Sequence, residues 1–127
     1  MQIKTTEELL RMEPEELLPY CKEHAEKLVL PDEIDTPEGR RILQTQLNYT
    51  TAMIAYYKEL EETAKIEKRR IKRKGCTREE ADRSLAVEEI FAMYKSIFER
   101  YYENLAKMVT IKRMAIEEAK IMGHGQT

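Results

Sequence analysis

Between residues 40 and 122 the chain contains one glycine, Gly75, and no proline. Glycine and proline supply most of the sharp reversals that a many-stranded sheet requires, so this stretch leaves little room for β-structure. The rest of the sequence is rich in Glu, Lys, Leu, Ala and Met, which are good helix formers. The sequence therefore predicts an all-α protein with long helices.

The first long helix is predicted from signals at both of its ends. Thr36 is a suitable N-cap residue, and Pro37 fits the first helical position, where a backbone N–H is not needed. Nothing interrupts the helix until Gly75, which can adopt the left-handed backbone conformation of a C-cap. We therefore expect a helix over residues 37–74, within the segment 36–75.

The second long helix starts directly after this glycine. Thr77 and Glu80 have the spacing of a capping box, and Gly123 is expected to end the helix. The segment 76–123 is thus predicted to form a helix over residues near 78–122, followed by a short tail at residues 124–127.

The apolar residues of these two helices predict that they pair as an antiparallel, coiled-coil-like hairpin. The second helix has the 4-3 spacing of a coiled-coil seam, and the first carries an apolar set that can face it. The seam of the second helix consists of Val87, Phe91, Tyr94, Phe98, Tyr101, Leu105, Met108, Lys112, Ala115, Ala119 and Met122. The facing set is Ile42, Leu43, Leu47, Tyr49, Met53, Ile54, Tyr56, Tyr57 and Leu60.

The sequence of residues 1–35 predicts short acidic helices, followed by a linker at residues 31–35. Pro14 and Pro19 each fit the first turn of a helix better than its interior, because proline has no N–H to donate. We expect these short helices to pack at the base of the hairpin, from which the charged tip projects. The whole chain, residues 1–127, is then a single helical domain.

Basic residues gather near the predicted turn. Residues 65–78 contain eight basic residues and one acid, whereas residues 1–40 contain eleven acids and five bases. The eight basic residues are Lys65, Lys68, Arg69, Arg70, Lys72, Arg73, Lys74 and Arg78. Such a dense cationic tip is a candidate binding site for a polyanion, and nucleic-acid backbone is the first choice. A solvated helix end, or a site for an acidic protein, fits the same charges.

Two adjacent tyrosine pairs, Tyr56-Tyr57 and Tyr101-Tyr102, are candidates for a partner interface. Tyrosine has an apolar ring and a polar tip, which suits an interface, although a broad helical core would use the same residues. The apolar surface along residues 42–60 and 102–122 is wider than one neighbouring helix can cover. We therefore expect a homodimer.

Nothing in the sequence points to catalysis or to a cofactor. Cys21 and His24 have a spacing that could hold a metal, but Cys76 and His124 lie too far along the chain to complete a site with four ligands. Cys21 and His24 are expected on a helix surface instead. The sequence has no Walker loop, no Gly-x-Gly-x-x-Gly and no Gly-x-Ser-x-Gly motif, so we expect no enzyme, metal or cofactor.

No apolar run approaches the length that spans a bilayer, and the first residues contain no apolar stretch of the signal-peptide type. The two cysteines are too few for a disulfide scaffold. We expect a cytoplasmic protein without membrane contact. The sequence favours a non-enzymatic interaction protein whose basic tip binds nucleic-acid backbone without sequence specificity. The alternative is an adaptor or small inhibitor that binds a protein through its tyrosine-rich or acidic helical faces.

Overall fold

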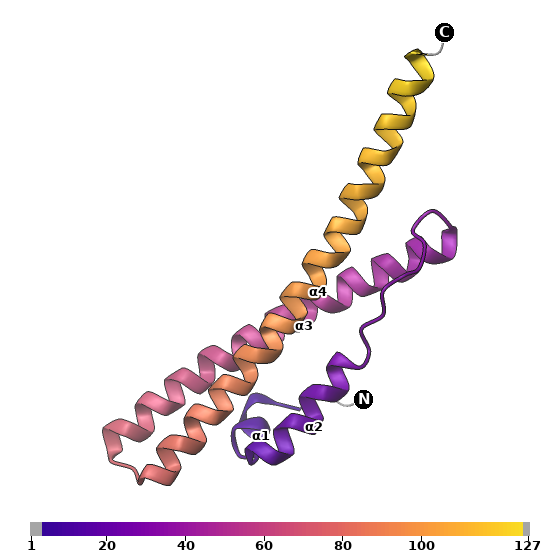
Figure 1. Cartoon of the computed structure of the whole chain (residues 1–127). Coiled ribbons are helices and arrows are strands. Elements are labelled where there is room, and N and C mark those ends of the chain that lie inside the picture. Colours follow the sequence, from indigo (N-terminus) through magenta and orange to yellow (C-terminus); the bar gives the residue numbers. More distant parts are fainter. Residues whose placement is uncertain (1–3, 126–127) are drawn as a thin grey trace.

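The computed structural model describes residues 4–125 of the chain, with side chains described as far as residue 121. These residues form four helices and no strand: α1 (Thr6–Leu10), α2 (Pro14–Ala25), α3 (Pro37–Lys74) and α4 (Arg78–Gly125). The two long helices run antiparallel and are joined by a short connection (Figure 1). The predicted all-α hairpin is thereby confirmed.

The ends of α3 follow the local signals of the sequence. The hydroxyl of Thr36 accepts a hydrogen bond of 2.9 Å from the backbone N–H of Gly39, and Pro37 occupies the first turn. Helix α3 ends at Lys74, and Gly75 has a φ of +85°, a conformation that costs any residue with a Cβ free energy. The predicted range of this helix is confirmed at both ends.

Helix α4 starts as predicted but runs further than predicted. The hydroxyl of Thr77 accepts a hydrogen bond of 3.2 Å from the N–H of Glu80. The helix then continues through Gly123 to Gly125, so the prediction that Gly123 ends it was wrong. Glycine inside a helix costs only about 1 kcal/mol relative to alanine, which is too little to force an end.

Of the two proline positions predicted for the short helices, one is confirmed and the other was wrong. Pro14 is in the first turn of α2, as predicted, but Pro19 lies in the interior of that helix. The lost backbone hydrogen bond is offset by burial on the opposite side, because Leu17 and Cys21 have no exposed surface and Tyr20 has little. Tertiary packing therefore overrides the local preference of proline here.

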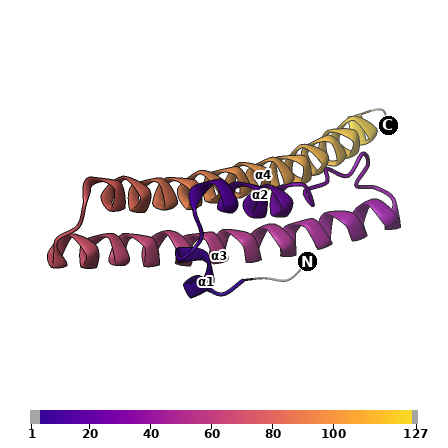
Figure 2. The ribbon, with the colours of Figure 1, turned by 90° about the horizontal axis from the view of Figure 1, so that it is seen from below.

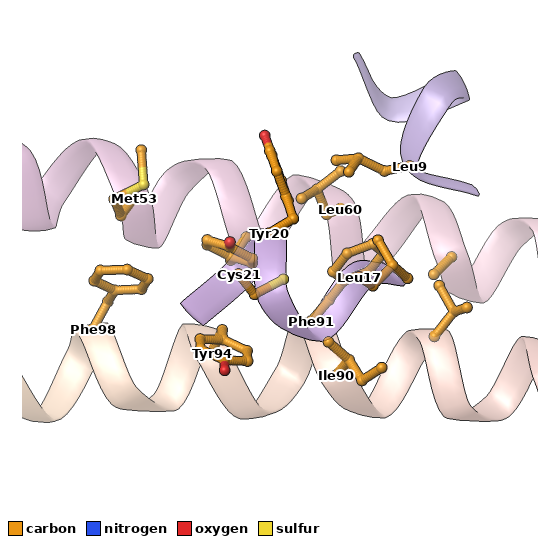
Figure 3. Close-up of a cluster of buried hydrophobic side chains, with 13 residues drawn as sticks. Leu9, Leu17, Tyr20, Cys21, Met53, Leu60, Ile90, Phe91, Tyr94 and Phe98 are labelled. Carbon is orange, nitrogen blue, oxygen red and sulfur yellow. The ribbon is translucent and has the colours of Figure 1, made fainter. Parts of the chain in front are cut away.

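The core lies in the middle of the hairpin, where α2 covers the seam between α3 and α4 (Figure 3). Tyr57 is at its centre, with ring centroids 5.6 Å from Phe98 and 6.1 Å from Tyr94. The buried cluster comprises Leu9, Leu17, Tyr20, Cys21, Met53, Tyr57, Leu60, Ala64, Val87, Ile90, Phe91, Tyr94 and Phe98. The seam predicted for α4 is confirmed as far as Leu105, the last buried residue among those with described side chains.

The N-terminal helices pack against the hairpin, as expected, and they lie beside its middle (Figure 2). Figure 2 shows α1 and α2 beside the middle of the hairpin, and Arg83 of α4 fixes the segment that joins them. Its guanidinium donates to the carbonyl oxygens of Leu10 and Met12 and pairs with Glu13 at 3.1 Å. The open end of the hairpin, where α3 and α4 diverge, lies further along the two long helices (Figure 1).

Replacing Gly75 with alanine tests the connection between the long helices. A Cβ at this position would meet no atom within 4 Å, so the whole cost comes from the backbone conformation. We expect Gly75→Ala to lower the free energy of unfolding by about 1–3 kcal/mol, measured by urea denaturation. The exposed Ser96→Ala variant is the control and should change it by less than about 0.5 kcal/mol. A Gly75→Ala variant with an unchanged free energy of unfolding would contradict the strain inferred for this turn.

Candidate functional site

The candidate site is the closed end of the hairpin, where the last turns of α3, the connection at residues 75–77 and the first turn of α4 meet (Figure 1). All eight predicted basic residues lie in this region, but their surroundings differ. Three of them are paired with carboxylates of the chain and five are not. The pairs of Lys65 and Arg70 follow helical spacing and that of Lys68 depends on the fold; the difference between paired and unpaired residues defines the site.

Lys65, Lys68 and Arg70 are the paired residues. The ammonium of Lys65 lies 3.2 Å from the carboxylate of Glu61, and that of Lys68 pairs across the hairpin with Glu88 of α4. Arg70 donates to both carboxylate oxygens of Glu67, three residues earlier. These hydrogen bonds lower the pKa of the Glu67 carboxyl, although its partial burial opposes the shift.

The remaining five basic residues are exposed and form no ion pair within the described part of the chain. They are Arg69, Lys72, Arg73, Lys74 and Arg78. We call this set the free cationic tip. The nearby acids Glu79 and Glu80 form no ion pair with it either, and they start α4, where carboxylates favour the helix dipole.

The composition of the tip determines which ligand it can hold. Its arginines can donate to phosphate oxygens in pairs, and its lysines act as mobile point charges. Ile71 is the only apolar residue between Lys68 and Lys74, and no aromatic side chain lies among residues 61–90 on which a base could stack. The site can therefore neutralise phosphates or carboxylates, but it offers no means of reading bases.

The four tyrosines predicted to form a partner interface are not a single surface. Tyr57 has no exposed area, so its predicted interface role is corrected: it is a core residue. Tyr56 is half-buried, and its hydroxyl is 2.8 Å from that of Tyr20 and donates to the Lys4 carbonyl at 3.0 Å. Tyr101 is also half-buried, which leaves Tyr102 as the one exposed member of the four.

Cys21 and His24, expected on a helix surface, are buried between α2 and the hairpin. The Nδ1 atom of His24 is 2.8 Å from the hydroxyl of Tyr57, and the hydroxyl of Tyr49 donates to the His24 carbonyl at 2.7 Å. The spacing of residues 17, 20, 21 and 24 is that of one helix face, and this pattern could have predicted their burial.

Burial changes the acid–base properties of this cluster. It lowers the pKa of the His24 imidazole, with a smaller contribution from the positive charge of Lys27. It raises the pKa of the Cys21 thiol to about 11 and that of the Tyr57 phenol as well. The Nε2 atom of His24 is buried and has no hydrogen-bond partner among residues 4–121.

No group of three or more metal-ligating side chains occurs among the described residues. No helix in the described range is long and apolar enough to cross a membrane. Comparison of the chain with protein-family models, with curated proteins and with solved structures finds no match.

The neutral, buried His24 predicts a pH dependence of stability. Its folded pKa is depressed below the unfolded value of 6.5, so the unfolded chain binds the extra proton first. The contribution of the neutral His24 to stability is therefore fully present above about pH 6.5, and it is lost as the pH drops from there toward the folded pKa. The melting temperature of the wild type should fall between pH 7.5 and 5.5, as followed by circular dichroism.

A His24→Gln variant is the matched control, because glutamine is polar but does not titrate. Its melting temperature should change less over the same pH range, although it is lower at pH 7.5. The Cys21 thiol and the phenols around His24 do not titrate there, because burial raises the pKa of Cys21, Tyr56 and Tyr57. Equal pH profiles for both proteins would rule out His24 as the source.

Proposed function

We propose that the chain is a non-enzymatic interaction protein whose free cationic tip binds a polyanion, with nucleic-acid backbone as the preferred ligand. The observation that carries this proposal is the set of five exposed basic residues without an ion-pair partner in the described part of the chain. Each can neutralise a phosphate and so release a cation condensed on the nucleic acid, which favours binding.

The tip is also separate from the part of the chain that holds the fold together. The buried residues of α3 end at Ala64, and those of α4 begin at Val87. The free cationic tip lies between these two positions in the sequence. Removing these charges should therefore leave the core intact. Lys72, Arg73 and Lys74 lie in the last turn of α3, where they favour the helix dipole, and exposed charges that repel one another also favour the binding of an external anion.

Salt dependence is the first test of this proposal. Five phosphate contacts give a slope of roughly −4 to −5 in a plot of log K against log salt concentration on duplex DNA. Replacing Arg69, Lys72 and Arg73 with alanine should reduce the slope to roughly −2 and weaken binding of unrelated sequences equally. Fluorescence anisotropy with two unrelated 20-base-pair duplexes measures both quantities.

A charge-matched variant controls for the change in net charge. Lys22, Lys58 and Arg100 are exposed, lie away from the tip and form no ion pair in the described part of the chain. Replacing these three with alanine should leave the slope close to that of the wild type. Absence of wild-type binding to DNA and RNA at low salt, or equal losses in the two triple variants, would reject the tip as a nucleic-acid site.

The alternative proposal is an adaptor or inhibitor that binds a protein. It is favoured by the acidic outer side of the short helices, where six glutamates are exposed: Glu7, Glu8, Glu15, Glu16, Glu23 and Glu26. A basic surface on another protein could bind them, and the exposed Tyr102 could add an apolar contact. Binding that is lost when Glu15, Glu16 and Glu23 are changed to glutamine, but not in the tip variant, would distinguish this function.

We also propose that the chain self-associates in the cytoplasm. Apolar side chains with 47–70% exposure lie on α4 beyond the last buried position, including Ile111, Met114, Ile116 and Ile121. Such residues favour an interface between copies. Cys21 and Cys76 are both free thiols, which suits a reducing compartment. Light scattering at micromolar concentration should report twice the mass of the chain.

A further inference from the structure

The outer side of the distal part of α4 carries a regular stripe of exposed residues. Beyond the core, Lys107, Ile111, Met114, Glu118 and Ile121 follow one another at intervals of four, three, four and three residues. Their spacing places them on one face of the helix, and all five are exposed. Ile111 is 66% exposed, Met114 56% and Ile121 70%.

This stripe is distinct from the side of α4 that faces the rest of the chain. Val109 and Ile116 line an open groove of about 630 Å³ together with Leu43 of α3. Lys112, between them, forms an ion pair with Asp35. Residues 109, 112 and 116 lie on the opposite side of the helix from the stripe, since successive residues are 100° apart. Ile111, at one edge of the stripe, also lines an open groove with residues 32–35, but all five stripe residues remain exposed.

The stripe is complementary to itself when a second copy lies antiparallel to it. In an antiparallel pair of helices with 4-3 spacing, four of the five stripe residues can face one another, and Ile121 faces the partner's Asn104, which is also exposed. With the twofold axis between Lys112 and Arg113, Ile111 faces the partner's Met114, and Lys107 faces the partner's Glu118. Two central apolar layers are then flanked on both sides by an ion pair.

The charges also select the direction of pairing. In a parallel pair at equal register, Lys107 would face the partner's Lys107 and Glu118 would face the partner's Glu118, so like charges would meet in two layers. In the antiparallel pair both layers become attractive. The bodies of the two copies then lie at opposite ends, because residues before 100 pass beyond Gly125, where the other copy's α4 ends.

We propose that two copies of the chain pair antiparallel through this stripe, with Lys107 of each copy bound to the partner's Glu118. The proposal rests on the self-association proposed above and specifies its surface, direction and register. At a rise of 1.5 Å per residue, it places the two cationic tips about 100 Å apart at opposite ends of the dimer.

Charge reversal tests the ion-pair layers. Lys107→Glu and Glu118→Lys each bring like charges together in both outer layers, so each variant alone should have a dimer dissociation constant at least tenfold above that of the wild type. An equimolar mixture of the two should dimerise like the wild type, and so should the double variant. Sedimentation equilibrium measures all four, and circular dichroism confirms that the variants stay helical.

Cysteine cross-linking tests the register independently. In a Cys76→Ser background, with Cys21 fully buried, Asn104→Cys and Ile121→Cys are introduced separately. In the proposed register, the two identical thiols of a dimer formed by one variant alone lie about 25 Å apart along the axis. In a dimer that combines both variants, the thiol at position 104 lies opposite the thiol at position 121. Only the mixture should therefore form a disulfide-linked dimer.

Three results would overturn the proposal, and they differ in meaning. Cross-linking of each variant alone would show a parallel pair. A wild-type dimer that neither cross-links in the mixture nor responds to charge reversal would show that another surface is used. A monomeric wild type at micromolar concentration would reject self-association itself, and it would leave the proposal for the cationic tip untouched.

Discussion

The Tyr57 side chain is the point at which three helices of the chain meet. Its ring belongs to α3 and stacks on Tyr94 and Phe98 of α4, while its hydroxyl bonds His24 of α2. A buried hydroxyl without a partner is costly, so α2 can dock only in the position that brings His24 to this group. The stacked rings fix the spacing of the long helices, and the hydrogen bond then fixes the third helix upon them.

Much of the fold could be predicted because its signals are local. Thr36, Pro37 and Gly75 act on their own neighbours in the sequence, so the bounds of α3 followed from them directly. Pro19 and His24 behaved differently. The exposed Pro19 lies inside α2, whose opposite side is buried, and His24 is buried against Tyr57, 33 positions away. Propensity alone places proline at helix starts and histidine on surfaces, whereas the packing of α2 on the hairpin determines both positions.

The ion pairs of the candidate site also divide into those that follow from neighbours in the sequence and those that depend on the fold. The basic composition of residues 65–78 is visible in the sequence, and the ion pair between Arg70 and Glu67 joins neighbours on one helix. The pairing of Lys68 with Glu88 crosses the hairpin and depends on how the two long helices are aligned. Only the three-dimensional arrangement therefore shows that Lys68 is paired, and within the described residues it leaves five of the eight basic residues without an ion-pair partner.

The length of α4 beyond its last buried residue, Leu105, has a consequence for how that end stays ordered. A short peptide of the same residues in water would have to form a first helical turn unaided, which is the unfavourable step in helix formation. Here the packed part of α4 already supplies that turn, and the remaining residues only extend it, one hydrogen bond at a time. The hairpin core thus acts as a template that holds an uncovered helix ready-formed in solvent.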